Sequence, residues 1–68
     1  MNEEVFNLGV RKFLKKFGVT AQREMEKAVD DAIRDGKLRG SETLKAHATV
    51  TIDGLAMKMV IDDEIPLA

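Results

Sequence analysis

The residues that could do chemistry are few in this chain. It has one histidine, His47, one serine, Ser41, and no cysteine. Nucleophilic catalysis needs a hydroxyl or thiol beside a base, and Ser41 has no nearby histidine in sequence to activate it. A lone imidazole without thiolates is a poor metal site, so we interpret His47 as a solvated strand residue. We therefore expect no enzymatic activity, no catalytic residue, no metal site and no cofactor.

Neighbouring carboxylates also fail as acid–base pairs. Asp30 and Asp31 follow one another on a predicted helix, where their side chains diverge by roughly 100°. Asp62 and Asp63 leave opposite faces of a predicted strand. The spacing of the five glycines matches neither a dinucleotide-binding turn nor a phosphate-binding loop.

The segment from residue 31 to residue 42 partly matches a calcium-binding loop. The matches at motif positions 1, 5, 6, 8 and 12 are Asp31, Asp35, Gly36, Leu38 and Glu42. Motif position 3 is Ile33, which belongs to an apolar stripe, and position 9 is the cation Arg39. A strand follows where the motif requires a helix. We interpret the segment as a charged helix end closed by a glycine.

A β-hairpin is the clearest of the elements that position these residues. Residues 43–52 alternate between apolar and polar side chains, which is typical of a strand with one buried face. The dipeptide Asp53-Gly54 favours a two-residue type I′ turn into a second strand over residues 55–62. Opposite residues then have numbers that add to 107, which places Lys45 opposite Asp62 and His47 opposite Val60.

Two helices are expected before the hairpin. Residues 3–17 follow the N-cap Asn2 and carry a stripe of four apolar residues: Phe6, Val10, Phe13 and Phe17. Gly18 suits the end of this helix, and Gly36 suits the end of a second helix over residues 21–35. The stripe of the second helix contains Ala21, Met25, Ala28, Val29, Ala32 and Ile33. We predict one α+β domain over residues 1–68, of order α-α-β-β, with both helices packed on one face of an antiparallel hairpin.

Composition argues against several classes of partner. The net charge of −1 builds in no attraction to nucleic acid or anionic lipid. No apolar run approaches the roughly 18 residues of a membrane span. Met1 leads directly into Asn2-Glu3-Glu4, unlike a secretory signal. The lack of cysteine fits a reducing compartment, so we expect a cytoplasmic location without a membrane partner.

Helix 3–17 is basic, and its cations form a candidate surface: Arg11, Lys12, Lys15 and Lys16. Two helices joined at residues 18–20 and followed by a hairpin could imitate a winged-helix nucleic-acid-binding domain. Its recognition helix would be residues 21–35, where five carboxylates outnumber three cations, and this favours protein over nucleic acid as the partner. A gel shift at low and moderate salt distinguishes the two hypotheses.

Two stretches resemble a family of small uncharacterised bacterial proteins. They run from Phe13 to Glu24 and from Gly36 to Leu44, and the likeness covers most of the chain. The resemblance implies a stand-alone cytoplasmic domain of unknown function. It brings no catalytic residue, cofactor or partner.

We therefore expect a non-catalytic interaction or structural protein that acts as a homo-oligomer, with the nucleic-acid binder as the alternative. A small enzyme or ligand binder is the third hypothesis, which a deep pocket with convergent polar groups would favour. The strand over residues 43–52 has a flat edge that could pair with its own copy and give an isologous homodimer. The competing hypothesis is a monomer in which Ile65-Pro66-Leu67 covers part of the sheet.

Overall fold

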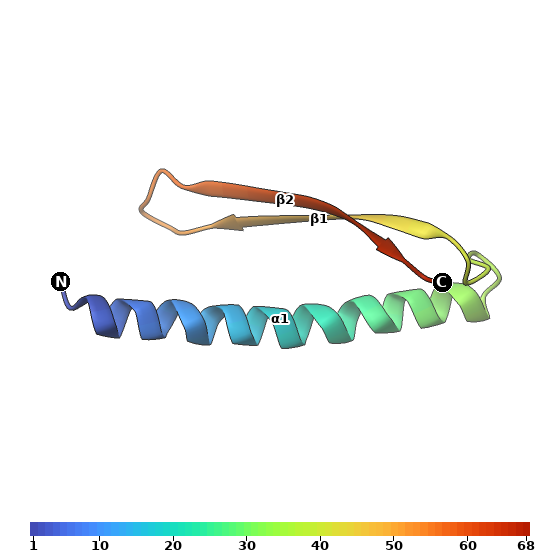
Figure 1. The fold of residues 1–68 in the computed structure, drawn as a ribbon, viewed down its shortest axis with the longest axis horizontal. Coiled ribbons are helices and arrows are strands. Elements are labelled where there is room, and N and C mark those ends of the chain that lie inside the picture. The colour runs from blue at the N-terminus through green and yellow to red at the C-terminus, as the bar shows by residue number, and fades with distance from the viewer. The chain divides into compact units, whose positions relative to one another are not determined.

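The computed structural model describes all residues from Met1 to Ala68, which form two compact units, Met1–Lys37 and Leu38–Ala68. The first unit contains the helix α1 (Glu3–Arg34), and the second contains the strands β1 (Thr43–Thr51) and β2 (Lys58–Pro66) (Figure 1). The expected α+β class with a β-hairpin is confirmed. The expectation of a single domain stays a prediction.

Both ends of α1 are set by local signals that the sequence contains. The side chain of Asn2 accepts a hydrogen bond from the Val5 backbone N–H at 3.1 Å, which is the N-cap interaction predicted for it. At the other end Gly36 has φ +77°, and its N–H donates to the Ile33 carbonyl at 3.1 Å. The Lys37 N–H donates to the Ala32 carbonyl at 2.8 Å, which completes a Schellman motif. Gly36 is therefore the C′ residue, as predicted.

The two separate helices predicted over residues 3–17 and 21–35 are wrong, because α1 is continuous through Gly18 and Thr20. Gly18 has no positive φ, so it does not end a helix. A glycine inside a helix costs about 1 kcal/mol relative to alanine, and a threonine costs less. The chain contains no proline before residue 66 that would force a break. The order of elements is therefore α-β-β, with one helix before the hairpin. The predicted order α-α-β-β, with two helices packed on one face of the hairpin, is wrong.

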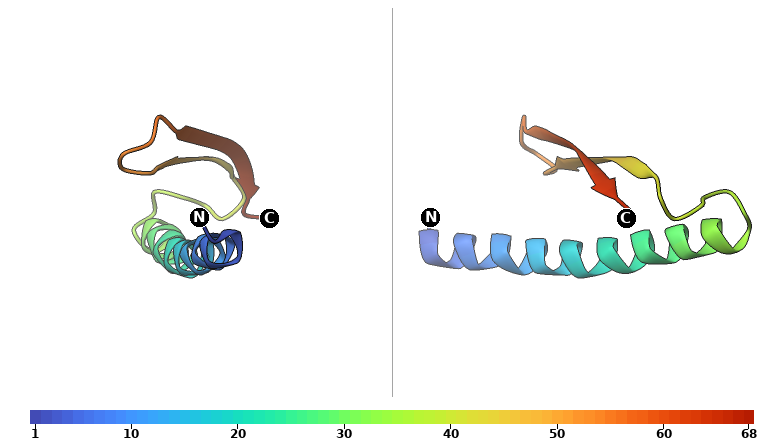
Figure 2. Two further views of the ribbon diagram at one scale, coloured as in Figure 1. Left: turned by 90° about the vertical axis from the view of Figure 1, so that its left-hand side faces the viewer. Right: turned by 45° about the vertical axis from the view of Figure 1, so that its right-hand side comes forward.

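The strands β1 and β2 form a two-stranded antiparallel sheet and twist about each other (Figure 2). Opposite residues have numbers that add to 109, from Thr43 with Pro66 to Thr51 with Lys58. The predicted register of 107 and the predicted second strand over residues 55–62 are therefore wrong. One more backbone hydrogen bond, from the Leu67 N–H to the Glu42 carbonyl at 2.9 Å, extends the ladder.

The geometry of the turn explains the change of register. The Leu55 N–H donates to the Ile52 carbonyl at 3.2 Å, so Asp53 and Gly54 are the central residues of a turn. Only Gly54 has a positive φ, +84°, whereas a type I′ turn needs positive φ at both positions. Positive φ at the second position alone is typical of a type II turn, whose twist splays the flanking strands. Pairing therefore begins only after the connection of residues 52–57.

The predicted assignment of side chains to the two faces of the hairpin remains correct, because a register shift of two residues leaves each side chain on its own face. Along β1 the apolar positions are partly buried and the polar positions are exposed. The partly buried residues are Leu44, Ala46, Ala48 and Val50.

Neither unit encloses a core, because no residue of the chain is buried. Phe6 and Phe13 expose 51% and 52% of their surface, and the hairpin residue Ile61 exposes 52%. An isolated helix and an isolated two-stranded hairpin are both marginally stable in water. Each unit therefore leaves apolar side chains exposed to solvent.

Candidate functional site

The first candidate site is one apolar stripe along the whole of α1, which joins the two stripes expected for separate helices. Its residues recur at intervals of three or four, as one face of a helix requires. The central positions of the stripe are Phe6, Val10, Phe13, Phe17, Ala21, Met25, Ala28 and Ala32. Val29 and Ile33, which also belong to the predicted second stripe, lie along one flank of these positions by helical geometry. Leu8 lies on nearly the opposite side of α1 by helical geometry.

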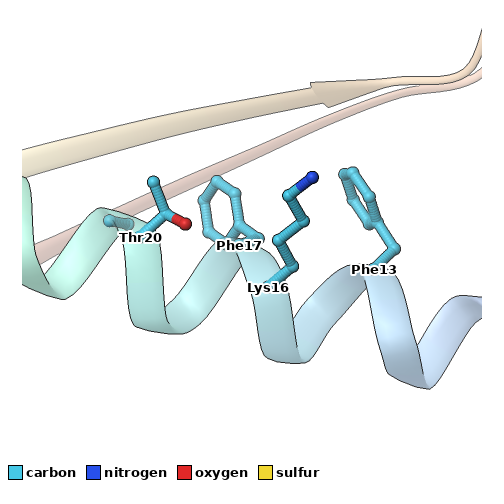
Figure 3. Close-up of a pocket in the computed structure, with 5 residues that line it drawn as sticks. Phe13, Lys16, Phe17 and Thr20 are labelled. Atoms are coloured by element: carbon cyan, nitrogen blue, oxygen red, sulfur yellow. The ribbon is translucent and has the colours of Figure 1, made fainter.

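The aromatic part of the stripe forms an open hollow. The ring centroids of Phe13 and Phe17 lie 6.4 Å apart, and the ring planes are inclined by 27°. Lys16, Thr20 and Ala21 complete the lining, and Figure 3 shows the four labelled side chains along the same part of α1. The surface of the hollow is almost wholly apolar. It offers mainly apolar contact area, and its polar lining residues are Lys16 and Thr20 alone.

The four residues of the predicted basic surface occupy two adjoining rows of α1. Arg11 and Lys15 are four residues apart in one row, and Lys12 and Lys16 are four residues apart in the other. All four are exposed, and none of them forms an ion pair. The structure therefore groups the cations on the first half of α1 without giving them a partner.

The continuity of α1 removes the geometry on which the winged-helix alternative depended. A helix–turn–helix requires two helices at a steep angle joined by a short turn. Residues 18–20, which would supply that turn, lie inside α1. The predicted recognition helix over residues 21–35 is the second half of the same helix.

The hairpin carries a second candidate site, a contact between His47 and Asp62 across the two strands. The Nδ1 atom of His47 lies 2.6 Å from Oδ1 of Asp62, and both side chains are 65% exposed. A carboxylate can orient an imidazole for proton transfer, but a nucleophile or a bound substrate must lie beside it. Ser41 precedes β1, and the chain has no cysteine. We interpret the pair as a cross-strand contact, worth about 0.2–1 kcal/mol.

Sequence reasoning missed this pair because the 107 register placed His47 opposite Val60. The sequence does contain a signal for the observed register, namely the number of basic residues that lie opposite acidic ones. The observed register places His47 opposite Asp62 and Lys45 opposite Glu64, whereas the 107 register gives only one pairing of a basic with an acidic residue. Counting complementary pairs across the ladder favours the observed register.

A third feature is the loop before β1, which closes around the carboxylate of Glu42. Its Oε1 accepts hydrogen bonds from the backbone N–H groups of Arg39, Gly40 and Ser41 at 3.0–3.1 Å. Its Oε2 accepts a second bond from the Arg39 N–H at 2.9 Å. These hydrogen bonds, led by that of Arg39, lower the pKa of Glu42 below its ordinary value.

The three carboxylates of the partial calcium-loop match are engaged with groups of the protein itself. Glu42 accepts from its own loop, as described. Asp31 and Asp35 lie 3.2 Å and 3.3 Å from the guanidinium of Arg34. No group of three or more histidine, aspartate or glutamate side chains is close enough to hold a metal ion.

No helix combines the length and apolar character needed to cross a membrane.

Comparison with known families gives a match over the whole chain. The matching model, DUF6494, is described as a family of unknown function and covers residues 1–68. The chain belongs to DUF6494. The resemblance to an uncharacterised family is thus confirmed, and membership in DUF6494 assigns no ligand or catalytic residue. Neither the search of curated proteins nor that of solved structures gave a match.

Proposed function

We propose that this DUF6494 chain is a non-catalytic interaction protein that works as a homo-oligomer. The observation that carries the proposal is the lack of any buried residue in either unit, although 44% of the residues are hydrophobic. Association that covers this surface supplies the hydrophobic stabilisation that a core gives to larger domains. The proposal includes a cytoplasmic location, which the cysteine-free sequence supports.

The chemistry of the candidate sites supports a role without catalysis. The hollow at Phe13 and Phe17 is almost wholly apolar, with Lys16 and Thr20 as its only polar lining residues. The contact between His47 and Asp62 is open to water, and no nucleophile accompanies it. These features fit surfaces that make contacts better than they fit surfaces that turn over a substrate.

The free edge of β1 is one place at which two copies would meet. The sheet has the order β1-β2, so each strand has one unpaired edge. The second half of β1, from Ala48 to Thr51, contains no charge, whereas β2 carries four charged residues. Pairing of β1 with its own copy, as expected from residues 43–52, gives an isologous dimer with a four-stranded sheet.

The observed register identifies the N–H groups that face each edge. Glu42 and Leu67 form a hydrogen-bonded pair, and such pairs alternate with non-hydrogen-bonded pairs along an antiparallel ladder. Thr49 and Val60 therefore form a non-hydrogen-bonded pair. The N–H of Thr49 points to the free edge of β1, and the N–H of Val60 points to the free edge of β2.

Sedimentation equilibrium at tens of micromolar tests the proposal. We expect a mass of at least two chains, each of 7.6 kDa. The substitution Thr49→Pro removes one edge donor without breaking the hairpin ladder, so it should lower the mass. Val60→Pro is the matched control on the other edge and should leave the mass unchanged. A monomeric parent protein would end the proposal.

A further inference from the structure

The apolar stripe of α1 reads the same in both directions along the chain. From Phe6 to Ala32 the intervals between its residues are 4, 3, 4, 4, 4, 3 and 4. Residues at equal distances from residue 19 therefore have numbers that add to 38. The side chains of the two halves differ in size, because all three phenylalanines lie in the first half and all three alanines lie in the second.

This symmetry matters for a contact between two copies of α1. If the helices run antiparallel about residue 19, Phe6 of one copy lies level with Ala32 of the other, and Val10 lies level with Ala28. In such a layer a large side chain meets a small one, which allows close packing without gaps. A parallel pair would place each phenylalanine against its own copy and each alanine against its own copy.

The inner layers of the stripe follow the same rule. Phe17 lies level with Ala21, and Phe13 lies level with the flexible side chain of Met25. The open hollow at Phe13 and Phe17 would thus be filled by residues of the second half of a partner helix. The stripe extends over a helix of 32 residues, about 48 Å long at 1.5 Å per residue.

The charges of α1 also favour the antiparallel arrangement. Residues 3–18 carry four cations and two carboxylates, whereas residues 19–35 carry five carboxylates and three cations. Lys16 borders the hollow, and Glu24 lies on the same flank of the stripe by helical geometry. In the antiparallel pair these two residues of opposite copies come within about 3 Å of one level along the axis. In a parallel pair Lys16 and Glu24 of opposite copies would lie eight residues, about 12 Å, apart along the axis.

We infer that two copies of α1 pair antiparallel through this stripe, with the two-fold axis near residue 19. The inference rests on the proposed function, because it names a second surface, besides the β1 edge, at which copies in the homo-oligomer meet. The occupant of the stripe is a second copy of the same chain. The contact is isologous, as in most closed dimers.

Disulfide trapping tests the arrangement in a chain that has no cysteine of its own. The double substitution V10C and A28C places one thiol in each half of the stripe. These positions are 18 residues apart, about 27 Å along a helix, so no disulfide can form within one α1. We expect mild oxidation to give a covalent dimer in which position 10 of one copy is joined to position 28 of the other. The single variants V10C and A28C should give at least about tenfold less covalent dimer, since their thiols would also lie about 27 Å apart.

Each result decides a different part of the inference. A dimer joined from 10 to 10 and from 28 to 28 would show a parallel pair and overturn the antiparallel arrangement. No covalent dimer, from a protein that sediments as an oligomer, would overturn the α1 contact and leave the proposed function standing. A protein that sediments as a monomer would overturn both.

A charge exchange in the chain without added cysteines gives a second, independent test. K16E should raise the dimer dissociation constant roughly fivefold, because two exposed attractions per dimer become repulsions. K16E combined with E24K should restore the parent value within twofold. Failure of the second substitution to rescue the first would contradict the antiparallel pair.

Discussion

The helix and the hairpin of this chain depend on interactions of different range. In α1 the backbone hydrogen bonds join residues four apart, and both ends are closed by neighbours in sequence. In the hairpin the paired residues range from Thr51 with Lys58 to Glu42 with Leu67. The two ends of α1 therefore depend on local sequence, whereas the pairing of the hairpin depends on the geometry of its turn. The stability of α1, in contrast, depends on what covers its stripe.

The largest effect should come from emptying that stripe. Phe13→Ala should cost about 3–5 kcal/mol, the range for a buried aromatic side chain, once a second copy covers the site. Leu8→Ala is the matched control, because Leu8 exposes 53% of its surface and Phe13 exposes 52%, yet Leu8 lies off the stripe. Its cost should stay near 0.5 kcal/mol. Urea unfolding at several protein concentrations measures both, and equal losses would show that the stripe is not covered.

In the hairpin the largest local effect should come from Gly54→Val. Gly54 has φ +84°, and nothing lies within 4 Å of a Cβ built there, so backbone strain alone decides the result. We expect a loss of about 1–3 kcal/mol and broadened amide resonances in β1 and β2. A variant as stable as the parent would contradict the conclusion that the turn at Asp53-Gly54 sets the register.

The corresponding glycine of α1 should respond in the opposite direction. Gly18 has an ordinary helical φ and open space at its Cβ position, so Gly18→Ala should stabilise the protein by about 1 kcal/mol. Thermal unfolding monitored by helical circular dichroism measures the change. Destabilisation by this substitution would favour a helix end at residue 18 and thus two helices.

A smaller effect should come from the contact between His47 and Asp62. A double-mutant cycle of His47→Ala and Asp62→Asn should give a coupling of about 0.2–1 kcal/mol, because both side chains are exposed. The matched control is the cycle of His47→Ala with Val60→Ala, since the 107 register would make that pair direct neighbours. Coupling to position 60 in place of position 62 would contradict the observed register.

The smallest effect should be confined to the loop before β1. The pKa of Glu42 is lowered in the folded chain, so its carboxylate stabilises the loop at pH values above its ordinary pKa. This contribution disappears as pH falls through the lowered pKa. Hydrogen exchange at the Arg39 and Gly40 amides should therefore accelerate in acid, after correction for intrinsic rates. Glu42→Gln should accelerate it at neutral pH and remove most of its dependence on pH, and equal protection in both proteins would contradict the prediction.

The sequence alone determined the features that depend on near neighbours. The N-cap at Asn2, the helix end at Gly36 and the phase of the stripe follow from side-chain oxygens, glycine conformation and the helical period. The alternation of residues 43–52 likewise predicted the apolar face of β1, and that face is confirmed. The contact between His47 and Asp62 and the loop around Glu42 match no recognisable motif, so only the geometry of the structure identifies them.

Only the three-dimensional structure decided the continuity of α1 and the register of the hairpin. Gly18 and Thr20 weaken a helix by about 1 kcal/mol or less each, so sequence signals could not show whether the chain breaks or continues there. Asp53-Gly54 supports more than one type of turn, and the φ of Asp53 selects among them. That choice moved the pairing by two residues and brought His47 to Asp62, a contact between residues 15 apart that no local pattern specifies.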